Sequence, residues 1–190
     1  PDNHTDGRKD TDSVLTTVEI IRMIRQVGIK FADLEGEATD APFGFASGGA
    51  AIFGVTGGVT EAVLRYLAND TAHSTIDAIK YSGIRGLDGI KEATVMVGDR
   101  EVKIAIVNGL VNAGKLLDKM KAGEAYYDFV EVMACRNGCI AGGGQPLPIG
   151  PRTKAGRIEG IYQVDRDSKI RVTDENPFIA QIYKEVITGN

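Results

Sequence analysis

The two cysteines of the chain, Cys135 and Cys139, are four residues apart. A secreted disulfide scaffold normally carries more cysteines, spread along the chain, so this close pair favours metal ligation or redox chemistry. Residues four apart share one side of a helical turn, which would let both thiolates reach one metal centre. Thiolates are soft ligands that suit iron–sulfur clusters or zinc. Glycines follow at residues 142–144, where the backbone would approach a cluster closely and aim amide donors at its sulfur.

Two other glycine-rich stretches have plainer interpretations. Residues 109–116 have the glycine and lysine spacing of a phosphate-binding loop, but Leu116 stands where a hydroxyl is needed to hold Mg²⁺. We therefore predict a strand-to-helix turn in which Gly109 relaxes the backbone. Residues 48–58 are small enough for close ligand contact, but they lack the GxGxxG spacing of a dinucleotide site. A tightly packed crossover, with Phe53 in the core, is the simpler hypothesis for them.

The elements that must position these motifs predict an α/β fold, with a partly parallel sheet flanked by helices. Apolar spacing predicts a helix from Val14 to Val27, capped by Thr16 or Thr17 and ended by Gly28. The remaining predicted elements are a helix at 59–68, strands at 93–97 and 101–107 joined by a hairpin turn at 98–99, a helix at 111–120, a strand at 127–134 with Phe129 inward, a strand at 169–172 and a helix at 177–187.

Bulk composition excludes several classes of protein. The chain has 190 residues, 43% hydrophobic and 25% charged, which allows one domain or two small lobes with a real core. Its formal net charge of −4 argues against a general nucleic-acid binder. No apolar run of about 18 residues and no secretory leader is visible, so we expect no membrane span and a cytoplasmic location. Residues 1–12 are polar and predict a flexible entry segment.

The segment from Glu131 to Pro146 resembles the third cysteine motif of the [FeFe] (iron-only) hydrogenases. That motif is ExMxCxxGCxxGGGQP, and every fixed letter is present. Similar stretches occur at residues 10–19, 40–44, 47–59, 107–109 and 175–177, so the resemblance covers almost the whole chain. It implies that residues 13–190 are the C-terminal part of the large-subunit catalytic domain, one lobe of it plus a C-terminal extension.

The resemblance implies a parent enzyme that catalyses 2H⁺ + 2e⁻ ⇌ H₂ at a [4Fe–4S] cluster linked to a diiron subcluster, the H-cluster. By motif position, Cys135 is similar to a ligand of the cubane, and Cys139 to the ligand that bridges to the diiron unit. Met133 resembles the residue packed beside that unit, and Phe53 the aromatic residue lining its pocket. The further cofactor-binding residues implied by the motif are Gly142, Gly143 and Gln145.

The same resemblance places the other two ligand cysteines and the proton-donating cysteine in motifs N-terminal to this region. We therefore expect the chain alone to be inactive and to lack a complete cluster. Its expected partners are the missing N-terminal part of the domain and an electron donor, either ferredoxin or an NAD(P)-linked subunit.

One departure and two alternatives remain. Family members often have Pro-Gly between the cysteines, where this chain has Arg136 and Asn137; a positive charge there would raise the potential of an anionic cluster, unless Arg136 points to solvent. The family also includes sensors and Narf-like assembly factors, so a non-catalytic iron–sulfur protein is the main alternative. A structural zinc module would need two further ligands, for which only His4 and His73 are available.

Overall fold

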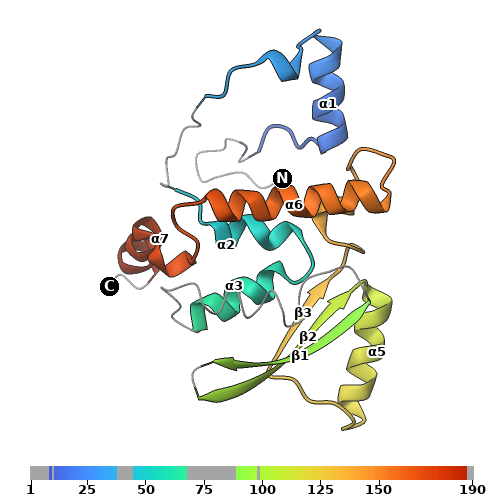
Figure 1. The fold of residues 1–190 in the computed structure, drawn as a ribbon, viewed down its shortest axis with the longest axis vertical. Helices are drawn as coiled ribbons and strands as arrows, with labels where there is room; N and C mark the ends of the chain where they lie inside the picture. Colours follow the sequence, from blue (N-terminus) through green and yellow to red (C-terminus); the bar gives the residue numbers. More distant parts are fainter. Residues whose placement is uncertain (1–8, 10, 38–44, 68–88, 98, 188–190) are drawn as a thin grey trace. The chain divides into compact units, whose positions relative to one another are not determined.

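The computed structural model describes residues 9, 11–37, 45–67, 89–97 and 99–187 (Figure 1). It divides into two units, residues 1–39 with 144–148, and residues 40–143 with 149–190. The first unit contains α1 (Thr17–Gln26) and a 3₁₀ turn (Phe31–Asp33). The helices of the second unit are α2 (Gly48–Ala51), α3 (Gly58–Leu67), α5 (Leu110–Lys121), α6 (Pro151–Asp167) and α7 (Pro177–Ile182), the last continuing as a π-helix (Tyr183–Ile187).

The second unit is built on a three-stranded mixed sheet in the order β1-β2-β3. Strands β1 (Ile90–Val97) and β2 (Arg100–Asn108) form an antiparallel hairpin. Strand β3 (Phe129–Met133) pairs parallel to β2, and α5 connects the two (Figure 1). The register sets Asn108 beside Met133, so both strands end at the same edge of the sheet. The α/β fold with a partly parallel sheet is confirmed.

The central strand β2 is buried on both faces, and its alternating side chains serve two cores. Val102, Ile104 and Ile106 pack with Leu64 of α3 on one face. On the other face, the core contains Ala105 and Val107 of β2 with Ala113 and Leu116 of α5. This two-sided burial is typical of a strand covered by helices, and it explains the nearly continuous apolar run of the β2 sequence.

Two predictions about the C-terminal region are wrong. Residues 169–172 form no strand, and α6, a helix of 17 residues, was not predicted. Helix α6 has a weak apolar period because it contains Gly156 and Gly160 and buries only Tyr162 and Asp165. Its stability therefore depends on packing against α2, which the local sequence does not reveal. The predicted terminal helix is confirmed, with Asn176 as its N-cap and Pro177 in its first turn.

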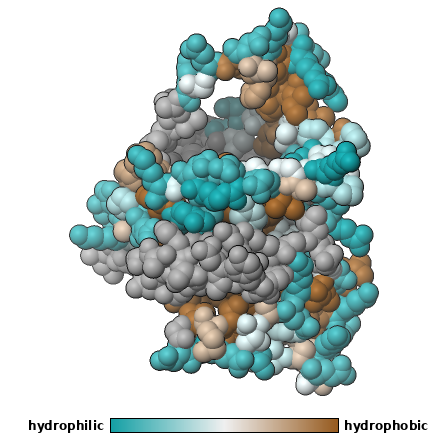
Figure 2. Space-filling view, in the orientation of Figure 1, coloured by the Kyte–Doolittle hydropathy of each residue, from teal (hydrophilic) through white to brown (hydrophobic). Residues whose placement is uncertain are grey.

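Helix α1 has the capping box of its predicted N-terminus. The Thr16 hydroxyl accepts from the Glu19 amide, and the Glu19 carboxylate accepts from the Thr16 amide at 2.7 Å. None of its residues is buried, and Figure 2 shows apolar atoms gathered over this helix. They border a hollow of about 720 Å³ that also includes Phe31. This exposed apolar face belongs to the first unit alone.

No helix within the described ranges is long and apolar enough to cross a membrane. Most of the predicted entry segment at 1–12, one residue of the hairpin turn (Gly98), His4 and His73 lie outside the described residues.

Candidate metal centre

The two cysteines lie just beyond the C-terminal end of β3. Strand β3 ends at Met133, and Cys135 and Cys139 are both free and exposed. They do not share a helical turn, as their spacing suggested: residues 134–138 form a bend and a turn, and Cys139 begins a short 3₁₀ helix (Cys139–Ala141). The turn, rather than helical periodicity, sets how the two thiols are presented.

That turn depends on two consecutive residues with left-handed backbone angles. Asn137 has φ +72° and Gly138 has φ +78°. Asparagine is one of the few side chains that tolerate this region, so Asn137 keeps the conformation that a glycine of the family would adopt at the same place. A Cβ on Gly138 would lie 2.7 Å from the Gly54 carbonyl oxygen and 3.2 Å from the Thr56 nitrogen. Gly138 is therefore required for both its angle and its close packing.

Asn108, at the end of β2, holds the other side of the turn. It is buried, and its side-chain oxygen accepts from the Asn137 amide at 2.7 Å. Its carbonyl oxygen accepts from the Asn112 side chain at 2.8 Å, and the Gly109 amide donates to the Met133 carbonyl at 2.8 Å. The glycine-rich stretch after β2 is thus a strand-to-helix turn, with Gly109 at φ +90°, and it supports the cysteine turn.

Glu131 is a structural residue of the site that sequence reasoning overlooked. Its side chain is buried in β3, where an inward Phe129 was the expected feature; Phe129 itself is only half-buried. One carboxylate oxygen accepts from the Gly57 amide at 2.8 Å. The other accepts from the Thr60 amide at 2.8 Å and the Thr60 hydroxyl at 2.6 Å. A carboxylate at the first turn of a helix is stabilised by the unpaired amides and the helix dipole.

Glu131 therefore joins the strand that leads to the cysteines to the start of α3 and the loop before it. The available signal was a glutamate inside an otherwise apolar strand, since buried carboxylates are rare unless they are paired. Thr56, in the same loop, has a buried hydroxyl without a partner among the described residues. Its backbone nitrogen is the one that faces Gly138.

The remaining predicted residues are not all brought together. Gly142 is near the pair, since its Cβ position would be 3.6 Å from the Cys135 sulfur, whereas Gly143 has open space around it. Gln145 belongs to the first unit, where its side chain donates to the Thr17 hydroxyl at 3.3 Å. Phe53 is 46% exposed, so it is not a core residue. It borders a hollow of about 480 Å³ formed with α3, α7 and the π-helix.

The donor set fits part of a thiolate-ligated iron site. Two exposed thiols, held by a rigid turn with glycines beside them, match the soft ligands and close backbone approach that iron–sulfur clusters use. No group of three or more metal-ligating side chains is present among the described residues. The described part of the chain thus offers two ligands of a site that normally requires four.

Comparisons with known proteins agree with this geometry. Residues 1–143 match the family model described as "Iron only hydrogenase large subunit, C-terminal domain", and residues 152–190 match "Iron hydrogenase small subunit". The chain is 40% identical to the NADP-reducing hydrogenase subunit HndD of Solidesulfovibrio fructosivorans, over 98% of this chain and 32% of that protein. It is 46% identical to the periplasmic [Fe] hydrogenase large subunit of Nitratidesulfovibrio vulgaris, over 79% of this chain and 36% of that protein.

Structural and more distant relatives extend the comparison. A solved structure of the [FeFe]-hydrogenase HydA1 from Chlamydomonas reinhardtii matches with a TM-score of 0.66 and 33% identity, over 93% of this chain and 51% of that chain. The cytosolic Fe–S cluster assembly factor narfl of Xenopus tropicalis is 31% identical, over 92% of this chain and 37% of that protein. The chain thus spans about a third of the length of the curated relatives it matches.

Proposed function

Because this chain belongs to the iron-only hydrogenase family, as the C-terminal domain of its large subunit, we propose that it forms part of the site at which a larger enzyme interconverts protons, electrons and H₂. The observation that carries this proposal is the free, exposed pair of Cys135 and Cys139 at the end of β3. Their turn is fixed by Asn108 on one side and by the packing of Gly138 on the other. Preorganised ligands are what a preassembled metal cofactor requires.

In this proposal, Cys135 binds a [4Fe–4S] cluster and Cys139 bridges that cluster to a diiron subcluster. When bound, this H-cluster supplies the redox chemistry of proton reduction and hydrogen oxidation. Met133 and Phe53 contribute apolar surface beside the diiron unit, and Gly142, Gly143 and Gln145 border the cofactor. Glu131 and Asn108 act on the ligands through the backbone, because their hydrogen bonds hold the ends of β3 and β2 in register.

The missing ligands and the proton route belong to the part of the relatives that this chain does not cover. We propose that the domain is completed by that N-terminal part, and that the chain alone is inactive and holds no complete cluster. The electron donor is a ferredoxin or an NAD(P)-linked subunit; the name of the Solidesulfovibrio relative favours the second. A cytoplasmic location is proposed from the cytosolic assembly factors among the relatives, although one hydrogenase relative is named as periplasmic.

A non-catalytic iron–sulfur protein is the second candidate. The similarity to the assembly factor narfl, over most of the chain, favours it. The cysteine turn serves both candidates, since both require thiolate ligands. They differ in whether the completed protein turns over hydrogen.

The deciding experiment uses the full-length protein with its cofactor assembled. Hydrogen evolution with a reduced viologen dye, together with iron content, is measured for the wild type, Cys139→Ser and the exposed control Val132→Ala. We expect evolution by the wild type and the control, and loss of both activity and diiron content in Cys139→Ser. A wild-type protein that holds its iron but neither evolves nor oxidises hydrogen would support the assembly or sensor function instead.

The isolated chain gives an independent test of the ligand assignment. We expect a colourless protein, in which both cysteines react with a thiol reagent under anaerobic native conditions, because both are exposed. Four stable irons per chain, without sharing between two chains, would contradict the ligand count. Cysteines that react only after denaturation would contradict the exposed turn.

A further inference from the structure

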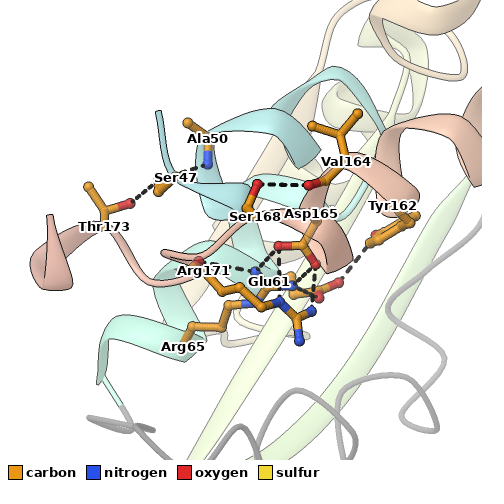
Figure 3. A network of polar contacts seen from close by, with 10 residues as sticks. All are labelled: Ser47, Ala50, Glu61, Arg65, Tyr162, Val164, Asp165, Ser168, Arg171 and Thr173. Atoms are coloured by element: carbon orange, nitrogen blue, oxygen red, sulfur yellow. Dashed lines mark hydrogen bonds and ion pairs between the residues drawn. The ribbon is translucent and has the colours of Figure 1, made fainter. Parts of the chain in front are cut away.

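The small-subunit segment of this chain is joined to the large-subunit segment by a buried network of charges. The two family matches meet between residues 143 and 152, and both sides of the junction are represented within the second unit. Figure 3 shows the network, with Glu61 and Arg65 from α3 on one side and Tyr162 and Asp165 from α6 on the other. Arg171, beyond the end of α6, completes it.

The contacts form a chain in which every charge has a partner. Arg65 donates two hydrogen bonds to the Asp165 carboxylate, at 2.7 and 2.9 Å. Its second terminal nitrogen also donates to Glu61 at 2.5 Å. Arg171 donates to Asp165 at 2.6 Å, and the Tyr162 hydroxyl donates to Glu61 at 3.2 Å. Two positive and two negative side chains balance one another.

The network is shielded from water, which makes each charge intolerant of a missing partner. The side chains of Glu61 and Arg65 are 0% exposed, that of Asp165 is 1% exposed, and Arg171 reaches the surface at 18%. A buried ion pair adds little net stability compared with an apolar contact, but removing one partner leaves an uncompensated charge at high cost. Such a network favours one matching surface over others.

Backbone fit and apolar packing surround the charges. The Gly48 and Gly49 amides donate to the Ile170 and Arg171 carbonyls at 2.8 and 3.0 Å. A Cβ on Gly48 would lie 2.3 Å from an Asp165 carboxylate oxygen, so glycine is needed there. Ile52, Val55 and Ile140 form an apolar core with Tyr162, flanked by Ile158 and Ile161. The surface of α2 and α3 is thus complementary to α6 in shape, polarity and charge.

We propose that the surface formed by α2 and α3 is a docking site for a small-subunit polypeptide, recognised through the Glu61–Arg65 pair, and that docking does not require the covalent connection. The chemistry of the fitting partner is defined by α6: a helix that presents a tyrosine and an aspartate three residues apart, followed by an arginine. The proposal concerns assembly and is independent of the hydrogen chemistry.

The test cuts the connection in the full-length protein. A protease site is inserted after Leu147, which is 81% exposed, and the cleaved protein is examined by size-exclusion chromatography. We expect the C-terminal segment to stay bound after cleavage, and to remain bound in about 1 M NaCl because buried pairs are screened little. Separation of the cleaved segments without denaturant would overturn the proposal.

Matched variants then test recognition by exchange of a labelled C-terminal segment. Asp165→Asn leaves two arginines underpaired, and we expect binding to weaken by roughly 100- to 1000-fold. Arg171→Ala, at the edge of the network, should weaken it by about 10-fold and serves as the deciding variant if Asp165→Asn does not fold. Glu159→Gln removes an exposed ion pair of the same helix and should change binding by less than about threefold. Equal binding by Arg171→Ala and Glu159→Gln would refute recognition through the network.

Discussion

Replacing Glu131 by glutamine tests whether the start of α3 is held by the strand that leads to the cysteines. The carboxylate accepts three hydrogen bonds, one from the Gly57 amide and two from Thr60. Glutamine has nearly the same shape but only one acceptor oxygen. Either the Gly57 amide or the Thr60 amide must therefore lose its acceptor inside the protein.

The expected loss of stability follows from these contacts. An unpaired buried donor costs about 1–3 kcal/mol, and loss of a negative charge at a helix N-terminus costs about 0.3–1 kcal/mol. We expect the free energy of unfolding to fall by about 2–3 kcal/mol, which with a urea slope of about 2 kcal/mol/M lowers the midpoint by about 1–1.5 M.

The assay is urea unfolding followed by far-ultraviolet circular dichroism. Glu101→Gln is the matched control, because Glu101 lies exposed on β2, and its effect should stay within about 0.5 kcal/mol. Thr60→Val, alone and combined with Glu131→Gln, completes a double-mutant cycle, and we expect a coupling free energy above about 0.5 kcal/mol. Equal midpoints for Glu131→Gln and Glu101→Gln would refute the reasoning, as would a coupling of zero.

Four further predictions concern single side chains. Asn137→Ala should lower the free energy of unfolding by about 1–2 kcal/mol, because alanine resists a φ of +72°; Asn137→Gly should not, and equal urea midpoints for the two variants would contradict the turn. The contact with Glu92 raises the pKa of Tyr127 to about 12, so its phenol should be the last to ionise in a titration at 295 nm, and Tyr127→Phe should remove that step; its contribution to stability is complete below the ordinary pKa of about 10 and is lost as the pH rises from there. Burial raises the pKa of Asp165, but hydrogen bonds from two arginines outweigh it and hold the pKa below its ordinary value; its stabilising effect is complete above about pH 4 and is lost as the pH falls through the folded-state pKa, so urea midpoints should fall less steeply with acid in Asp165→Asn. Thermal melts with and without Mg²⁺-ATP should superimpose, and a nucleotide-dependent rise in Tm that Lys115→Ala abolishes would establish a phosphate site after β2.

The sequence alone determined the features that depend on neighbouring residues. The motif around Cys135 and Cys139 indicated the family and the ligand type, and the cap at Thr16 located the start of α1. Apolar runs gave the hairpin, β3 and the crossover helix α5, because strands and amphipathic helices have periods of a few residues. The mixed sheet followed from the alternation of these elements.

Only the tertiary structure decided how the site is held and which charges are buried. Glu131 meets Thr60 across 71 positions of sequence, and Arg65 meets Asp165 across 100. A glutamate or an arginine has no local property that says whether it faces water or a distant partner. Helix α6 was missed for the same reason, since its few apolar residues stabilise it only through contact with Ile52 and Val55. The turn between the cysteines takes its left-handed angles because Asn108 and Gly54, brought from two other segments, fix Asn137 and Gly138 in place.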